Sequence, residues 1–291
     1  MRFWVLQTLN ALSFGGILFL IASGFSLIFG LTRVVNLSHG ALFMLGAYLG
    51  AASSSAGLPF PVSLLIGGAV SGVVGGVLER VLLRRLITRS SSERVFAQVL
   101  ITLGLAFVIA DACIWIWGGD PMYVNAPAAL GGVALLGGFA FPVYRLAVVA
   151  AAVLIAVGLW LLLEHTRLGA MIRAGVDNME IARSVGIPVS RLFTGVFCAG
   201  AALAGMGGVL AGPVLTVYPG LDAEILPLAL VVVILGGIGS LAGALAGSVI
   251  IGFIFSFGQS LFPDLSYVIL FLPMALTLAI WPRGLFGMVR P

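Results

Sequence analysis

Residues 225–257 read ILPLALVVVILGGIGSLAGALAGSVIIGFIFSF and contain no charged side chain. Because about 20 apolar residues span the hydrocarbon core of a bilayer as a helix, this stretch is too long for a single crossing. It is interrupted at residues 236–240 by Gly-Gly-Ile-Gly-Ser, which is a turn signal. We therefore predict two consecutive apolar helices here, joined by a tight hairpin or separated by a break in one helix.

The composition of the whole chain agrees with a membrane protein. Of its 291 residues, 61% are hydrophobic and 8% are charged, whereas a soluble domain has about a quarter charged residues. A chain this apolar cannot cover itself with a polar shell, so its outer surface must face lipid. We expect one all-α membrane domain over residues 1–291, folded as a polytopic helical bundle.

Apolar runs along the chain predict about nine transmembrane helices, within a range of eight to ten. The second run is short and follows a polar patch, so it could instead be a re-entrant segment. The nine runs are residues 10–31, 40–56, 62–83, 95–117, 143–163, 193–217, 225–238, 241–257 and 267–281.

The distribution of arginine predicts the orientation in the membrane. With nine crossings and an outer N-terminus, 12 of the 14 arginines fall on one side, in residues 80–94, residues 164–191, the C-terminus and Arg33. Arg2 and Arg145 are the two exceptions. Loops rich in arginine stay in the cytoplasm, so we expect the C-terminus to be cytoplasmic.

The sequence also limits the chemistry that this chain can perform. It contains no lysine, and a P-loop needs one to reach the terminal phosphates. If a P-loop ATPase drives this protein, a separate subunit must supply it. Cys113 and Cys198 lack metal-ligand spacing, so we expect no metal site and no cofactor in this chain.

Small residues recur at four-residue spacing and therefore line single helix faces. Such rows let membrane helices approach closely. They indicate tight packing within the chain, although one row could instead line a dimer seam or a sliding gate. The rows are Gly68, Gly72 and Gly76; Gly200, Ala204, Gly208 and Gly212; and Gly239, Gly243 and Gly247.

The longest cytoplasmic loop, residues 165–192, contains the signals of a short helix. Asp177 is a suitable N-cap, and Glu180 follows three residues later, as in a capping box. Glu180 and Arg183 are spaced to pair on one helix face. Gly186 suits a left-handed C-cap, and Pro188 prevents the helix from continuing.

We thus predict a helix of two to three turns over about residues 178–185, between the fifth and sixth membrane helices. A capped helix can dock into a groove of a motor subunit as a rigid body, which a flexible loop cannot do. The alternative is an interfacial helix that only connects two membrane helices.

The residues of this helix resemble a known motif. Glu180-Ile-Ala182 followed by Gly186-Ile-Pro188 resembles the EAA-type motif of bacterial ABC importer permeases, except that Ile181 stands where the motif has alanine. Three other stretches, in this order, strengthen the resemblance: RVVNLSHGALFMLGAY at 33–48, LGGIGSLAGALAG at 235–247 and PRGLFG at 282–287. Together they resemble the permease family of bacterial high-affinity branched-chain amino acid ABC importers over nearly the whole chain.

That resemblance implies a set of partners and a location. A second homologous permease subunit would pair with this chain in the bacterial inner membrane. Two ATP-binding subunits would hold ATP and Mg²⁺ and dock at the predicted helix, through Asp177, Glu180, Ala182, Arg183, Gly186 and Pro188. A periplasmic substrate-binding protein would deliver leucine, isoleucine or valine. Related systems carry other amino acids, urea, short amides or small organic acids.

Polar residues next to the apolar runs are candidates for a translocation pathway, because polar groups at membrane depth are costly. Asn36, Ser38 and His39 form the best cluster; alternatively, they form a polar turn that caps the second helix. Asp222 and Glu224 follow Pro-Gly in a short outer loop and are candidates for docking the binding protein. An ordinary solvated loop is the alternative for these two carboxylates.

Two other classes of protein are weaker hypotheses. A stand-alone secondary transporter or channel would need carboxylates deep in the bundle, and Asp111 comes nearest to that requirement. An intramembrane hydrolase would need Ser26 and His39 to act together, without an evident acid nearby. Proton- or sodium-driven uptake by the isolated chain would support the first alternative. Labelling of Ser26 by a serine-reactive probe would support the second.

Overall fold

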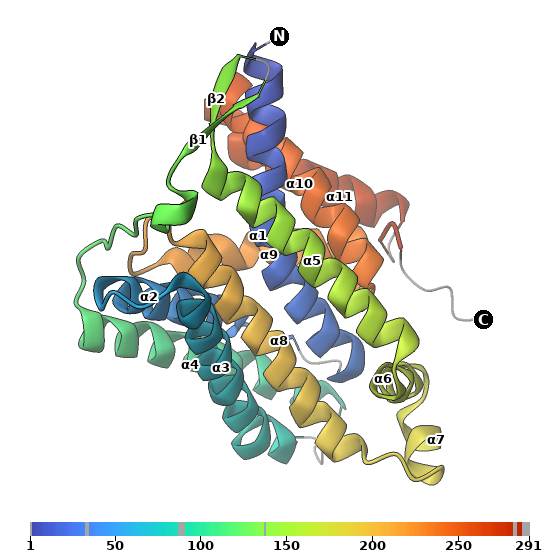
Figure 1. The fold of residues 1–291 in the computed structure, drawn as a ribbon. Coiled ribbons are helices and arrows are strands. Elements are labelled where there is room, and N and C mark those ends of the chain that lie inside the picture. Colours follow the sequence, from blue (N-terminus) through green and yellow to red (C-terminus); the bar gives the residue numbers. More distant parts are fainter. Residues whose placement is uncertain (1, 33–34, 87–90, 137, 282–283, 287–291) are drawn as a thin grey trace.

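The computed structural model describes residues 2–32, 35–86, 91–136, 138–281 and 284–286. Within these ranges the protein consists almost entirely of helices, with one short β-hairpin near an end of the bundle (Figure 1). The α-helices are α1 Arg2–Thr32, α2 His39–Ser55, α3 Phe60–Val81, α4 Ser91–Trp117, α5 Val143–His165, α6 Arg167–Asp177, α7 Met179–Ser184, α8 Val189–Ala211, α9 Leu221–Gly236, α10 Leu241–Leu261 and α11 Ser266–Ile280.

Shorter elements complete the fold. The hairpin consists of β1 Val133–Leu136 and β2 Phe139–Pro142, which pair antiparallel. Three 3₁₀ turns lie at η1 Leu83–Leu86, η2 Ala128–Leu130 and η3 Pro263–Leu265. The sequence analysis predicted neither the hairpin nor α6 as separate elements.

All nine predicted apolar runs form helices, but nine full crossings are not confirmed. Six helices in the described ranges, α1, α3, α4, α5, α8 and α10, are long and apolar enough to span a membrane. The other three, α2, α9 and α11, have 17, 16 and 15 residues. At 1.5 Å per residue they rise about 22–25 Å, less than the roughly 30 Å of a hydrocarbon core. The fold is a multi-pass helical membrane bundle with three short helices.

The break predicted at residues 236–240 is a tight hairpin. Helix α9 ends at Gly236 and α10 begins at Leu241. Gly237 and Gly239 have φ angles of 101° and 83°, a region that side chains with a Cβ seldom adopt. The turn then closes on Ser240, whose hydroxyl accepts a hydrogen bond from the amide of Gly243 at 3.0 Å.

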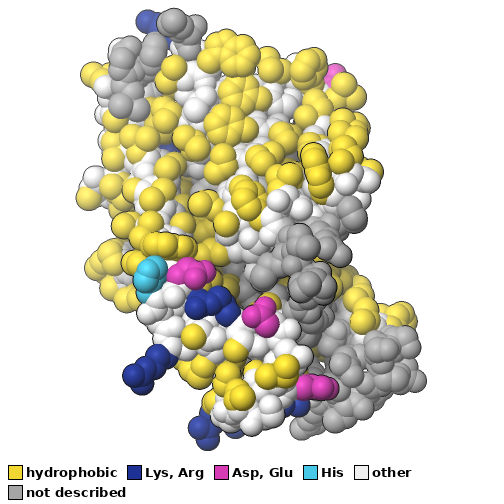
Figure 2. Space-filling view, turned by 90° about the vertical axis from the view of Figure 1, so that its right-hand side faces the viewer, with side chains coloured by type: hydrophobic (Ala, Val, Ile, Leu, Met, Phe, Trp, Pro, Cys, Tyr) yellow, Lys and Arg dark blue, Asp and Glu magenta, His cyan; other side chains and the backbone are white. Residues whose placement is uncertain are grey.

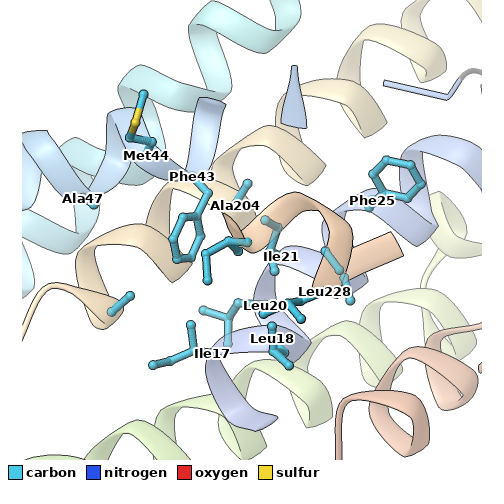
Figure 3. Packing of buried hydrophobic residues seen from close by; sticks show 14 of the residues in the cluster. Ile17, Leu18, Leu20, Ile21, Phe25, Phe43, Met44, Ala47, Ala204 and Leu228 are labelled. Atoms are coloured by element: carbon cyan, nitrogen blue, oxygen red, sulfur yellow. The ribbon is translucent and has the colours of Figure 1, made fainter. Parts of the chain in front are cut away.

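Helix α1 runs through the middle of the bundle, with α5, α8, α9 and α10 packed around it (Figure 1). In its most apolar stretch, 89% of the residues are buried inside the protein. Figure 3 shows the centre of this core, where Ile17 and Leu20 of α1 meet Phe43 of α2, Ala204 of α8 and Leu228 of α9.

Antiparallel packing of α10 on α1 locates the membrane on α1. At one end of the contact, the Ser26 hydroxyl donates a hydrogen bond to the Ser240 carbonyl. At the other end, the side-chain amide of Gln7 donates to the Ser260 hydroxyl. Since 21 residues of α10 rise about 31 Å, the part of α1 between Gln7 and Ser26 matches the thickness of a hydrocarbon core. We therefore infer that the middle of the bilayer lies near Ile17.

The rows of small residues face neighbouring helices of the same chain. In α3, an added Cβ on Gly68 would lie 2.8 Å from Met206 of α8, and one on Gly72 would lie 3.1 Å from the Cys198 carbonyl. Gly76 faces the Cys198 sulfur, Gly208 faces the Phe43 carbonyl and Gly212 faces Val124. Around the hairpin, Gly239 faces Gly30, Gly243 faces Gly236 and Gly247 faces Val232. Close helix packing in this chain thus depends on these glycines.

Candidate functional site

The predicted cytoplasmic helix is α7, and it is one part of a longer helical connection. Helix α6 follows α5 directly, with Thr166 as its N-cap, whose hydroxyl accepts from the amide of Gly169 at 3.1 Å. Asn178 then separates α6 from α7. The segment from α5 to α8 is therefore built from two short helices with defined ends.

The N-cap of α7 differs from the prediction. Asn178 is the cap, because its Oδ1 accepts from the amides of Glu180 and Ile181 at 3.0 and 3.1 Å. Asp177 is instead the last residue of α6. Asp and Asn are equally suited to this position, and the extension of α6 to residue 177 decides between them. The predicted Glu180–Arg183 ion pair is also absent from the ion pairs of the described residues.

The C-terminal end of α7 agrees with the prediction. Gly186 has a φ of +87°. Its backbone amide donates to the carbonyl of Arg183, and the amide of Ile187 donates to the carbonyl of Ala182, both at 3.0 Å. This pattern is a left-handed helix stop. Pro188 then directly precedes α8, so two residues separate the left-handed stop at Gly186 from the start of the next helix.

Helix α7 has one buried and one exposed face. Ala182 is 2% exposed and packs in a cluster with Leu31 of α1 and with Val189 and Leu192 of α8. Ile181 and Val185 are 60% and 70% exposed, and Glu180 and Arg183 are exposed too. A short helix that is fixed on one side and presents mixed apolar and charged groups on the other suits docking to a partner protein.

A buried carboxylate next to this segment was missed in the sequence. Glu79, at the end of α3, pairs with Arg84 of η1 at 3.3 Å and accepts from the Thr194 hydroxyl of α8 at 2.7 Å. Arg84 also donates to the carbonyl of Ser190 at 2.9 Å. These contacts attach α3 to the first turns of α8. The one available signal was a lone acid within a glycine-rich apolar helix.

The predicted pathway residues lie together at the N-terminal end of α2. Asn36 Oδ1 accepts from the backbone amide and the hydroxyl of Ser38 at 3.1 and 2.6 Å, so Asn36 stabilises the turn before α2. His39 Nε2 lies 3.0 Å from the carbonyl oxygen of Ile21. All three side chains are at most 1% exposed.

Two polar atoms of this cluster, Asn36 Nδ2 and His39 Nδ1, have no hydrogen-bond partner among the residues that the structure describes. Contact with Ile21 places His39 about four residues along α1 from the middle of the bilayer. Buried polar groups normally have partners, so unpartnered ones at this depth are available to a polar solute. No side-chain hydrogen bond caps α2 in the described residues, because Asn36 Oδ1 bonds Ser38 in the turn before the helix. A pathway role for these residues stays a prediction.

Asp222 and Glu224 lie in the first turn of α9 rather than in an open loop. An added Cβ on Gly40 would lie 2.7 Å from the Asp222 carbonyl, so the N-terminal ends of α2 and α9 touch. Asp222 is half-buried, whereas Glu224 is exposed and accepts a hydrogen bond from the Tyr218 hydroxyl. Docking of a binding protein at these two carboxylates stays a prediction, and Glu224 is the more exposed of the two.

Ser26 and His39, the two residues of the hydrolase hypothesis, form hydrogen bonds with other groups and not with each other. The Ser26 hydroxyl donates to the Ser240 carbonyl at 3.4 Å, and the His39 ring contacts the Ile21 carbonyl. Asp111, the acid of the stand-alone transporter hypothesis, is exposed on α4.

Two of the quoted sequence stretches meet in space at the α9–α10 hairpin. The amides of Leu285 and Phe286 donate to the carbonyls of Leu235 and Gly236 at 2.8 and 2.9 Å. The C-terminal stretch thus closes the turn that begins α10.

Comparison with known proteins now assigns the family. Residues 7–278 match the family model described as the branched-chain amino acid transport system / permease component. The chain belongs to this family. It is therefore a multi-pass membrane permease, and the helical bundle with its capped connection between α5 and α8 is the permease fold of this chain.

Individual relatives carry corresponding names. The high-affinity branched-chain amino acid transport system permease protein BraD of Pseudomonas aeruginosa is 27% identical, over 97% of this permease and 95% of the relative. The LivH permease protein of Escherichia coli K12 is 27% identical over 98% and 96%. A probable LivH of Methanocaldococcus jannaschii is 28% identical over 84% and 77%.

Among solved structures, PsaBC from Streptococcus pneumoniae in complex with Fab has a TM-score of 0.49 and 14% sequence identity. The match covers 93% of this permease and 89% of that chain.

Proposed function

We propose that this permease is one membrane subunit of an ABC importer that moves branched-chain or closely related amino acids across the bacterial inner membrane. The observation that carries the proposal is the match of residues 7–278 to the permease family. The names of the relatives support the substrate class. No covalent chemistry occurs in this chain, and ATP with Mg²⁺ binds to separate subunits.

The partners follow from the same proposal. A second homologous permease subunit completes the pathway, two ATP-binding subunits dock on the cytoplasmic face, and a periplasmic binding protein delivers the amino acid. The exposed face of α7 supports docking of an ATPase, since Glu180, Ile181 and Val185 project from a helix whose other face is fixed by Ala182. The C-terminus is cytoplasmic, in agreement with the arginine distribution.

Within the membrane, the amino acid passes the N-terminal ends of α2 and α9. The free atoms of Asn36 and His39 offer hydrogen bonds to a polar solute at mid-depth. The same polar groups would be costly against lipid. Their burial in the present arrangement means that access to them requires helix movement, which α7 and α8 would transmit.

ATP hydrolysis by the assembled complex in lipid tests this function. The complex, with its binding protein, is supplied with a panel of leucine, isoleucine, valine, other amino acids, urea, short amides and small organic acids. We expect stimulation by leucine-type ligands. Stimulation by another compound would correct the substrate, and failure of any ATPase to co-purify would favour a stand-alone transporter.

The coupling role of α7 has its own test. Glu180→Ala and Gly186→Ala should weaken ATPase docking by about fivefold or more, as loss of an interface contact worth about 1 kcal/mol does. Membrane insertion should remain normal. Ser184→Ala is the matched control, because its hydroxyl donates to the Ile181 carbonyl within α7 itself. Normal coupled transport in both test variants would refute the coupling role.

A further inference from the structure

An apolar groove opens where α5 leaves the bundle. Midway along its length α5 is close to α1, since an added Cβ on Gly16 would lie 3.1 Å from Ala152. Further along, Val157 and Trp160 of α5 line an open space beside α1 and are 47% and 52% exposed. The space between α1, α5, α6 and the start of α10 is a cavity of about 650 Å³.

The walls of this groove suit a hydrocarbon chain. They are formed by Phe19, Leu27, Val157, Ile172 and Leu245, among others. The two hydroxyls in the wall, Ser26 and Ser240, already bond the Ser240 carbonyl and the Gly243 amide. The wall thus offers few hydrogen-bonding groups to a polar ligand. An empty apolar space would lose the dispersion contacts of its walls, so in a membrane it is filled.

Charged groups stand at the cytoplasmic end of the groove, where α5 gives way to α6. Arg173 and Glu164 form an ion pair at 3.5 Å, with 43% and 51% of their side chains exposed. Asp177 also lines the cavity and is exposed. Figure 2 views this side of the molecule, and acidic and basic side chains lie just below a wide hydrophobic surface.

We propose that the groove binds one phospholipid of the inner leaflet with a phosphoethanolamine-type headgroup. Its acyl chain fills the apolar groove, its phosphate pairs with Arg173, and its primary ammonium pairs with Glu164 and Asp177. Among the described residues the rim carries one positive group, Arg173, and two negative groups, Glu164 and Asp177, so it complements a zwitterion with an N–H donor. A choline headgroup lacks that donor, and an anionic headgroup without an amine meets two carboxylates.

Trp160 is a built-in probe, because it lines the groove. The full-length chain is placed in bilayers that contain brominated phosphatidylethanolamine or brominated phosphatidylcholine, and Trp160 emission is obtained by difference from Trp160→Phe. At equal mole fraction, the ethanolamine lipid should quench Trp160 about two- to fivefold more effectively, the preference expected of an exposed ion-pair site. The measurement does not depend on transport activity, so it is separate from the proposed function.

Matched variants decide between specific binding and bulk lipid contact. Arg173→Ala should reduce the headgroup preference to about one, and Ala242→Phe, at an exposed position of the wall, should lower quenching by either lipid. Trp115 on α4, which is 93% exposed outside the groove, should show no preference.

Three outcomes would overturn the proposal. The first is equal quenching of Trp160 by both lipids. The second is stronger quenching by brominated phosphatidylglycerol than by the ethanolamine lipid. The third is loss of quenching when the partner subunits are assembled, which would mean that a protein covers the groove.

Discussion

Glu79 and Arg84 differ in their exposure to water, and this difference decides which of the two substitutions destabilises the protein more. The side chain of Glu79 is 4% exposed, whereas that of Arg84 is 33% exposed. Removing the arginine leaves a buried carboxylate whose remaining side-chain partner, among the described residues, is the Thr194 hydroxyl. Removing the glutamate leaves an arginine that water can solvate. An unpaired buried charge is far more costly than an unpaired exposed one.

We therefore expect Arg84→Ala to destabilise the protein by about 3 kcal/mol and Glu79→Ala by about 1 kcal/mol. Thermal unfolding of the full chain in detergent measures both. Glu79→Gln is the control, because it keeps a hydrogen-bond acceptor for Thr194 without the charge. If Glu79→Ala were the more damaging of the two, the carboxylate would have a role beyond satisfying its own burial.

At the scale of elements, the cap of α7 shows what the sequence could not decide. Asp177 and Asn178 are adjacent, and both are good N-cap residues. Only the length of α6, which ends at Asp177, leaves Asn178 to cap the next helix. The end of α7 was predictable, because Gly186 and Pro188 leave a single possible stop. Local sequence signals therefore determined the C-terminal end of α7, where a single residue suits the helix stop, but not the N-cap, where two neighbouring residues do.

The corrected cap leads to a paired prediction. Asn178→Ala should destabilise α7 by about 1 kcal/mol, since it removes the acceptor for two backbone amides. Asp177→Ala should change α7 by no more than about 0.5 kcal/mol. Hydrogen exchange of the α7 amides measures both, and a larger effect of Asp177→Ala would mean that the cap is at residue 177.

Close packing of α2 on α8 gives a second prediction for elements. A methyl group on Gly46 would overlap the backbone of Gly205, and a backbone cannot move aside as a side chain can. Gly46→Ala should therefore cost about 1–3 kcal/mol in thermal stability. Gly104→Ala is the matched control, because nothing lies within 4 Å of its added Cβ; it should raise helix stability by about 0.5–1 kcal/mol. Equal effects would mean that α2 and α8 are not in close contact.

At the scale of the whole molecule, hydropathy predicted which segments are helical but not how deep each one lies. Every apolar run contains a helix because, inside a bilayer, the backbone amides and carbonyls of a segment must bond one another. The meeting of α2 and α9 near mid-depth depends on contacts such as Gly40 with Asp222, and those join residues about 180 positions apart. No local pattern encodes such a contact. The groove beside α5 could not be predicted from the sequence either, since it depends on how α5 is placed relative to α1.

The direction of α2 is the part of the topology that labelling can decide. If α2 starts near mid-depth and runs outward, Ser55 lies on the same side of the membrane as Tyr123, which follows α4 and is 83% exposed. If α2 were re-entrant and returned to the cytoplasm, Ser55 would share the side of Ile181 in α7.

Single cysteines at these three positions, in a chain with Cys113 and Cys198 changed to alanine, distinguish the two topologies. A membrane-impermeant maleimide added to intact cells should label Ser55→Cys and Tyr123→Cys, while Ile181→Cys should react only after permeabilisation. The arginine distribution requires the same orientation for α7, since its charges resist translocation. Protection of Ser55→Cys together with Ile181→Cys would contradict the outward course of α2. Because α2 brings His39 to mid-depth, that result would also remove the structural basis for a pathway between α2 and α9.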